Sequence, residues 1–364
     1  MSANAALLEA AIDHEVDLRR FSTGVVYRIM AELNRADARL MAALAEAMMR
    51  LDAQSFTVER LEALLSSVRA LNAQAYDAVR LALESELRGL ADVEAAAQAA
   101  QLRAAIPSVV QLRFPIAAVS AEQVYAAALS QPFQGRLLRE WAANLAESRL
   151  RQVREAVRSG YVDGQTTSDI IRKIRGTKAL RYADGLLERP RRELATVVQT
   201  ALSHTAQLAR QASYDANAAL LKGVKWTSVL DGRTSPPCML RDGKLYTADR
   251  AHKPIGHKIP WGAGPGRLHW NCRSVSVPIT RSWRELGIDA DDIPAGQRAS
   301  MDGALPADLT YAQWFAKQSA ARQDEIVGPE RGRLIRSGKV TFPQLYSPNG
   351  RWLTLEQLRQ RVSP

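Results

Sequence analysis

The residues best suited to chemistry in this chain are two cysteines and a histidine that share one stretch of sequence. His269 and Cys272 are three positions apart, which lets two side chains bind one ion, and Cys238 comes from an earlier strand turn. Structural zinc sites take four ligands, and only these three strong ones are obvious. A bound water could complete the set. The candidate protein ligands for the fourth place are Asp242, His252 and His257.

Other interpretations of the cluster stay open. Cys238 and Cys272 could form a disulfide in an oxidising environment, or could be small buried side chains. A cysteine–histidine nucleophile needs an orienting group and an oxyanion hole, and no peptidase or transferase motif surrounds either cysteine. His257, His269 and Asn271 match a His-Asn-His nuclease only loosely. We therefore expect a metal, disulfide or packing role and no catalytic residue.

The charge and the apolar runs of the chain indicate which classes of partner to expect. The chain has 364 residues and a net charge of +11, which favours a polyanionic partner such as nucleic acid. No apolar run reaches the roughly 18–20 residues of a membrane span, and the first residues do not form a secretory signal. We expect synthesis in the host cytoplasm and no membrane partner.

The positive charge is concentrated between Arg149 and Arg192, where twelve Lys or Arg accompany five Asp or Glu. Such clusters can neutralise phosphates without reading sequence, although a solvated face or an acidic protein partner explains them equally simply. Tyr161 and Tyr182 are the interleaved aromatics, so single-strand recognition is not expected. The DNA-contact candidates are Arg151, Arg154, Arg158, Arg172, Lys173, Arg175, Lys178 and Arg181.

Long helices are predicted in the N-terminal part of the chain. Residues 1–106 contain no proline, and residues 73–105 are rich in alanine. Such helices form a bundle core or a docking surface for another protein. One apolar stripe at helical spacing consists of Val26, Ile29, Leu33, Ala36, Leu40, Leu44 and Met48.

Further helices are predicted in the middle of the chain. Ser120 and Gln123 form a capping box for a helix that ends before Pro132. A second helix is expected over about 134–158, with Gly160 as its stop. A third covers 166–175, and Pro190 fits the first turn of a long helix that reaches Leu221.

A small β unit follows this helical region, so the predicted fold class is α+β. Strands are expected at 224–230, 245–246 and 274–279, the last with alternating burial, and a Gly- and Pro-rich loop covers 253–266. The predicted domains are 1–106 (helical arm or bundle), 107–192 (helical, basic) and 193–364, which contains the Cys/His module 224–280 and a helical tail 281–364.

Three strings in this unit carry a family resemblance: LDGRTSPPC at 230–238, RDGK at 241–244 and GRLHWNCRS at 266–274. They resemble the Mu F-like family of phage minor head, or head morphogenesis, proteins. The family's last cysteine is Ser274 here, which weakens a four-ligand metal site. The tail at 324–358 is also similar, with a capping box at Thr354. The motif residues are Asp231, Arg233, Thr234, Asp242, Gly243, Asn271 and Arg273.

The resemblance implies a structural minor capsid protein of a tailed phage, located in the virion near the portal vertex. Its expected partners are the portal protein, other capsid components and phage DNA bound without sequence preference. Its expected roles are head assembly, genome packaging or DNA delivery. Zinc is the only cofactor left open. The alternative is an enzyme, of nuclease, transferase or toxin type, that uses Cys238, His269 and Cys272.

Overall fold

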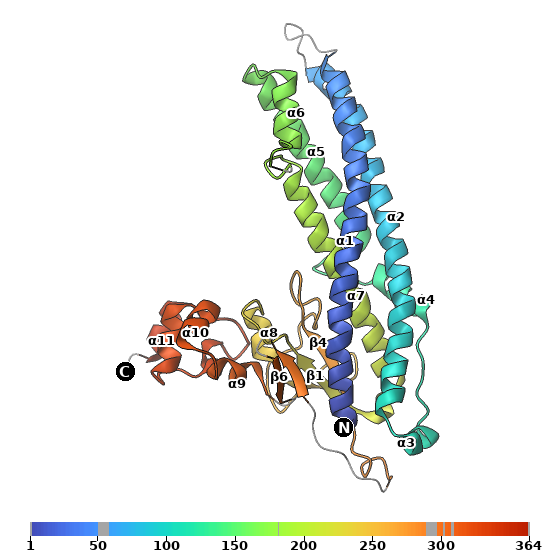
Figure 1. Ribbon diagram of the computed structural model, residues 1–364, viewed down its shortest axis with the longest axis vertical. Helices are drawn as coiled ribbons and strands as arrows, with labels where there is room; N and C mark the ends of the chain where they lie inside the picture. The colour runs from blue at the N-terminus through green and yellow to red at the C-terminus, as the bar shows by residue number, and fades with distance from the viewer. Residues whose placement is uncertain are drawn as a thin grey trace. The chain divides into compact units, whose positions relative to one another are not determined.

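The computed structural model describes residues 2–49, 58–180, 182–288, 297–300, 303–306 and 309–362, and it confirms the α+β class (Figure 1). The chain forms two compact units, each built from several stretches of sequence. Unit 1 comprises Met1–Arg19, Leu90–Ala127 and Ser203–Pro364. Unit 2 comprises Arg20–Gly89 and Ala128–Leu202. No helix within the described residues is long and apolar enough to cross a membrane.

Two long helices account for most of the N-terminal segment, as predicted, and both contribute to each unit. They are α1 (Ala3–Met49) and α2 (Val58–Ala105). The predicted stripe on α1 is buried in unit 2, except that Val26 and Ala36 are half-buried. The C-terminal part of the stripe, from Leu40 to Met48, packs against Val153 and Ile170 of two later helices. Helical periodicity was therefore sufficient to identify the packed face of α1.

A buried carboxylate interrupts this apolar stripe. Asp37 of α1 is only 5 % exposed and accepts hydrogen bonds from Arg149, which is 1 % exposed, and from Arg191 at 2.5 Å. A buried charge is tolerated only where it is paired and hydrogen-bonded. The two arginines belong to different helices, so this cluster ties α1 to both. Arg149 therefore adds nothing to the exposed positive charge, which the count between Arg149 and Arg192 overstates.

The middle helices lie close to their predicted positions, with two corrections. Gly160 does not stop its helix: it is buried inside it, and a Cβ there would lie 2.3 Å from Ile170 Cγ1. The long helix ends at Ala216 rather than Leu221, before the 3-10 turn η2 (Ala218–Leu220). Thr166 caps its helix by accepting from Asp169 N. The helices are α3 (Ser108–Arg113), α4 (Ala121–Ser130), α5 (Leu138–Val162), α6 (Thr167–Arg175) and α7 (Glu188–Ala216).

A four-stranded antiparallel sheet of order β3-β2-β1-β4 lies in unit 1. Trp226 of β1 and Val277 of β4 are fully buried in its core. The last strand is buried at nearly every position, so the alternation predicted for it is wrong. Its strands are β1 (Leu221–Thr227), β2 (Leu245–Tyr246), β3 (Pro254–Ile255) and β4 (Val275–Thr280), with the short helix α8 (Pro236–Arg241) between β1 and β2.

The C-terminal segment packs onto the β unit. Leu230 and Met239 share one hydrophobic cluster with Tyr311 and Trp314. The capping box predicted at Thr354 is confirmed: Thr354 N donates to Gln357 Oε1 at 3.0 Å, and Gln357 N donates to Thr354 Oγ1 at 3.2 Å. The elements are the hairpin β5 (Gln297–Ser300) and β6 (Gly303–Pro306), α9 (Tyr311–Ala316), α10 (Ala320–Val327), α11 (Pro329–Arg336), η3 (Phe342–Leu345) and α12 (Leu355–Val362).

Two helical glycines of unit 2 give a matched test of this packing. Gly160→Ala forces a methyl group into Ile170, so we expect it to reduce the free energy of unfolding by about 1–3 kcal/mol. Gly89→Ala meets nothing within 4 Å and should add about 0.5–1 kcal/mol through helix propensity. Urea unfolding monitored by circular dichroism measures both. Equal effects of the two changes would contradict the close approach of α5 and α6.

Candidate functional site

The two cysteines and the histidine predicted from sequence come together in unit 1. Cys238 lies on α8, whose first turn holds Pro236 and Pro237, and not on a strand turn as expected. His269 and Cys272 lie on a tight turn closed by Cys272 N, which donates to His269 O at 3.2 Å. The turn needs a left-handed residue, and Asn271 supplies it with φ 55°. A proline-started helix and a tight turn therefore position the three side chains.

The distances within the cluster are those of direct contact. Cys238 Sγ lies 3.2 Å from His269 Nε2 and 3.6 Å from Cys272 Sγ. Both cysteines are buried free thiols, with Cys272 fully inaccessible, and His269 is half-buried. These are the atoms that gather closely enough to hold a metal ion in the described part of the chain.

The histidine ring is oriented by its neighbours. His269 Nδ1 lies 2.9 Å from Trp270 O, so in the neutral ring Nδ1 donates to that carbonyl and Nε2 keeps its lone pair. Ser235 Oγ lies 2.7 Å from Nε2 and can then donate to it. Metal-binding histidines are oriented by such a bond from the second ring nitrogen.

The cysteines have opposite protonation tendencies. Donation from Cys238 holds the pKa of Cys272 well below its usual value, against the effect of burial and with help from His269. The Cys272 thiolate in turn raises the pKa of Cys238, as does burial. The same thiolate raises the pKa of His269, although burial opposes this. Two cysteine sulfurs and an imidazole nitrogen thus face one another, a donor set suited to a soft metal ion.

Two of the distances between the candidate ligand atoms are close to those around a tetrahedral zinc ion. Ligands at about 2.3 Å (sulfur) and about 2.05 Å (nitrogen) from zinc lie about 3.8 Å apart for two sulfurs and about 3.6 Å for sulfur and nitrogen. The observed distances, 3.6 Å between the two sulfurs and 3.2 Å between Cys238 Sγ and His269 Nε2, would increase only slightly around such an ion. Ser274, at the place of the family's last cysteine, is buried and hydrogen-bonds the Cys238 thiol. The fourth ligand of the family pattern would therefore stand beside this cluster.

The other candidate ligands have different roles. Both carboxylate oxygens of Asp242 accept backbone N–H groups at 2.7 Å, from Ser228 and from Tyr311. His257 has both ring nitrogens bonded to the backbone, and His252 stacks on Trp261 at 4.2 Å between ring centroids. None of the three joins the group of ligand atoms found among the described residues. His257 is accordingly not a free base next to His269.

The remaining motif residues form a second connected set. Arg273 makes a two-pronged ion pair with Asp231, at 2.6 and 2.8 Å, and Asp231 Oδ1 also accepts from Arg233 N at 3.0 Å and Thr234 Oγ1 at 3.1 Å. Gly243 has φ 77°, and a Cβ there would lie 2.8 Å from Thr310 Cγ2. Each motif residue thus has a structural explanation in turn or loop geometry, except Arg233, of which only the backbone N–H is used.

Some residues of the site were missed from sequence. Ser228 Oγ donates to Cys238 O at 3.0 Å, and Arg19 of α1 donates to Cys272 O at 2.5 Å. Ser235 lies inside the motif string, but nothing in its type marks it as a histidine partner. Arg19 is far away in sequence, and only the fold brings it to the cluster.

The DNA-contact candidates lie in unit 2 and are exposed where the structure describes them. Arg151 pairs with Glu147 at 3.6 Å, and Arg172 pairs with Asp169 at 2.7 Å. Arg181 lies outside the described residues. The exposed candidates are Arg151, Arg154, Arg158, Arg172, Lys173, Arg175 and Lys178.

Comparison with known proteins gives one match. Residues 151–277 match the model of a family described as "Phage Mu protein F like protein". No curated protein and no solved structure matches the chain. The match includes the Cys/His cluster and confirms the resemblance there. The match begins before the predicted domain boundary at 193 and ends before the C-terminal helices, whose likeness to the family stays a prediction.

The Asp231–Arg273 pair predicts a pH-dependent stability. Burial opposes ionisation of Asp231, but the bonds from Arg273 and its neighbours outweigh burial and lower its pKa. Its stabilisation is therefore present above the unfolded-state pKa and is lost as pH falls through the folded one. We expect Asp231→Asn to cost about 1–2 kcal/mol at pH 7, since the pair is partly exposed.

The measurement is urea unfolding of wild type and Asp231→Asn between pH 7 and pH 3. The difference in the free energy of unfolding between wild type and Asp231→Asn should become smaller towards pH 3. The exposed carboxylate Asp163 provides the control, and Asp163→Asn should have little effect at any pH. A difference that stays constant across the range would show that the pair contributes no ionic stabilisation.

Proposed function

We propose that the chain is a structural minor protein of a tailed-phage head, because its residues 151–277 match the model of the phage Mu protein F like family. In this proposal it lies in the virion near the portal vertex, binds the portal protein and other capsid components, and aids head assembly, genome packaging or DNA delivery. The family match is the observation that carries the proposal. The hydrogen-bonded state of the motif residues supports a role for them in the fold.

Exposed apolar side chains on the long helices support protein docking by unit 2. Tyr27 of α1 is 73 % exposed, and Leu81 of α2 is 58 % exposed. A large apolar side chain that faces solvent on a helix can contact a partner helix or groove. We propose that Tyr27 and Leu81 each contact the portal protein.

The exposed basic side chains of α5 and α6 support contact with DNA. Arg151, Arg154 and Arg158 follow each other at helical spacing on α5, and all three are exposed. Arginines in such a row bind phosphates without reading bases, and the affinity then falls steeply with salt. This contact would serve a protein that meets the packaged genome at any sequence.

The Cys/His cluster is assigned to architecture and not to catalysis. The lowered pKa of Cys272 beside His269 also suits a nucleophile, and this observation favours the enzyme alternative. A nucleophile must reach its substrate, however, and Cys272 has no exposed surface. We therefore propose a non-enzymatic protein in which zinc, held by Cys238, His269 and Cys272, fastens α8 to the turn before β4.

The zinc proposal is tested by metal content and by two changes at the cluster. We expect about one zinc per purified chain, as in other structural sites. Cys238→Ser should release the metal and lower the unfolding temperature. Ser274→Cys should strengthen zinc binding against a chelator, because it supplies the thiolate missing beside Cys238.

Ser337→Cys is the matched control, since it adds an exposed cysteine to the C-terminal helices and should leave zinc affinity unchanged. Mass spectrometry of the metal and chelator competition provide the readouts. A metal-free protein in which both native cysteines react with thiol reagents while folded would contradict the zinc site.

The head-protein proposal is tested by co-expression with the portal protein of the same phage. We expect the two proteins to elute together in size-exclusion chromatography. Tyr27→Glu with Leu81→Glu should reduce the recovered complex at least about tenfold, because each change places a charge in the apolar contact.

Val109→Glu with Leu112→Glu provides the control, with the same chemistry at two exposed apolar residues of α3. This pair should leave the complex intact. If the wild-type chain does not elute with the portal protein, the portal assignment fails. Equal losses with both pairs would show that added charge alone disrupts the complex.

A further inference from the structure

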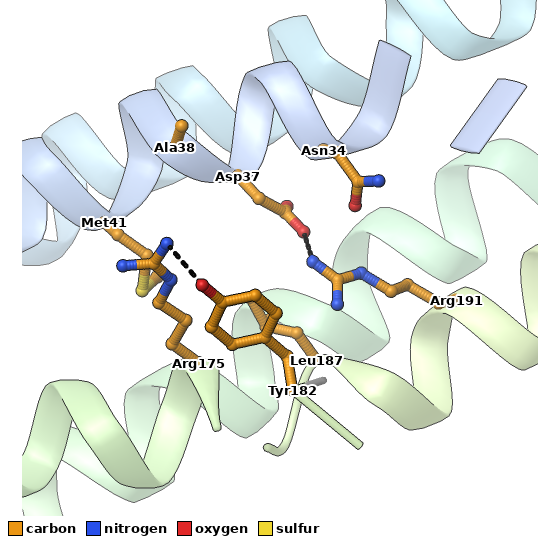
Figure 2. Close-up of a pocket in the computed structure, with 8 residues that line it drawn as sticks. All are labelled: Asn34, Asp37, Ala38, Met41, Arg175, Tyr182, Leu187 and Arg191. Carbon is orange, nitrogen blue, oxygen red and sulfur yellow. Dashed lines mark hydrogen bonds and ion pairs between the residues drawn. The ribbon is translucent and has the colours of Figure 1, made fainter. Parts of the chain in front are cut away.

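Unit 2 contains a pocket that none of the motif residues explains (Figure 2). Its volume is about 330 Å³, within the range of small-ligand sites. One wall comes from α1, and the others come from the end of α6, the connection that follows it and the start of α7. The lining residues are Asn34, Asp37, Ala38, Met41, Arg175, Tyr182, Leu187 and Arg191.

The charges around the pocket favour an anion. Two guanidinium groups, of Arg175 and Arg191, line it against one carboxylate, that of Asp37. Asp37 is already paired with the buried Arg149 behind the wall as well as with Arg191. The lining thus carries two positive charges and one negative charge, and Arg149 already neutralises part of that negative charge from behind the wall.

The two lining arginines keep donors for a ligand. The bonds that Arg191 makes among the described residues use Nη2, so Nη1 is left for a ligand, whereas Nε is buried out of a ligand's reach. Arg175 stacks over the Tyr182 ring at 4.8 Å and makes a long bond of 3.3 Å to its hydroxyl. Figure 2 shows the Arg175 guanidinium beside Met41 and the Arg191 guanidinium beside Asp37, with the Tyr182 ring between them. Arginine donors of this kind match the oxygens of a phosphate.

The connection after α6 holds the tyrosine in an unusual conformation. Tyr182 has φ 64°, which is rare for a bulky residue. Thr177 N donates to Asp184 Oδ1 at 2.8 Å, and Gly176 and Gly185 approach so closely that a Cβ on Gly185 would lie 2.5 Å from Gly176 N. Such conformations persist where neighbouring structure enforces them, and they gather at binding sites.

The pocket also has an apolar side, formed by Ala38, Met41 and Leu187. Inorganic phosphate alone would leave this surface uncovered. We propose that the pocket binds a nucleotide, with its phosphate on Arg175 and Arg191 and its base or sugar against the apolar side and Tyr182. The nucleotide is either free or the phosphorylated end of a DNA strand. The proposal rests on the pocket alone and does not require the head-protein assignment.

Calorimetric titration of the full chain tests the proposal. Deoxyadenosine 5′-monophosphate should bind, and both deoxyadenosine and inorganic phosphate should bind at least about tenfold more weakly. R175Q should weaken monophosphate binding about tenfold or more by removing a charged donor. Arg175 is exposed, so this change should leave the thermal unfolding of the protein unaltered.

R172Q is the matched control, with the same charge change three positions earlier on α6 and outside the pocket. It should change monophosphate affinity less than about twofold. Absence of saturable binding by the monophosphate, or equal losses in R172Q and R175Q, would overturn the proposal. Equal losses would mean that only general surface charge attracts the ligand.

Duplex DNA with 5′-phosphate or 5′-hydroxyl ends distinguishes the source. A preference for phosphorylated ends that R175Q abolishes supports binding of a DNA terminus. Equal binding of both duplexes, with the monophosphate still bound, supports a free nucleotide. The triple change R151Q, R154Q and R158Q should weaken duplex binding and leave monophosphate binding intact, which separates this pocket from the basic surface of α5.

Discussion

The buried carboxylate of Asp242 holds together the parts of unit 1 that carry the family motif. It accepts one N–H from Ser228, where β1 ends, and another from Tyr311, where α9 begins. A buried carboxylate that lost either donor would pay a large desolvation penalty, so both segments are fixed relative to α8, which Asp242 follows directly. The hydrophobic cluster of Leu230, Met239 and Trp314 forms around this junction. The Asp-Gly pair of the motif is explained by the same site, because Gly243 turns the chain where a side chain would meet Thr310.

The Cys/His cluster adds a second junction on the other side of α8. In the sheet only β1 and β4 are longer than two residues. The pairing of the short strands β2 and β3 is therefore not enough to order the long connection that joins β1 to β4. Cys238, His269 and Cys272 close that connection, and Arg19 joins α1 to it through the Cys272 carbonyl. The lowered pKa of Cys272 and the raised pKa of His269 are expected both for a catalytic pair and for a set of metal ligands. The full burial of the Cys272 sulfur is the reason why we propose the structural role, since a nucleophile must be reached by its substrate.

Sequence reasoning was most successful where a local signal decides the structure. The stripe on α1, the cap at Thr354 and the clustering of His269 with Cys272 follow from periodicity, capping chemistry and spacing. It failed where distant residues decide. Gly160 permits close helix packing because Ile170 lies against it, and no local pattern distinguishes that from a helix stop. The fold buries Asp37 and Arg149 together, and nothing in the sequence around either residue marks it as buried. The nucleotide pocket is lined by residues of α1 and α7, which are far apart in the chain, so no local sequence motif predicts it.

The two units thus carry different kinds of polar chemistry. Unit 1 uses its polar groups to close a connection, and unit 2 uses a buried ion cluster to back a positively charged pocket. The central claim is that the family's motif residues are architecture, and hydrogen–deuterium exchange of a Cys272→Ala variant tests it most directly. The account predicts loss of amide protection throughout residues 221–280, with the protection of α5 and α6 unchanged. Protection that stays at the wild-type level across 221–280, together with loss of an activity on DNA or nucleotide, would contradict it.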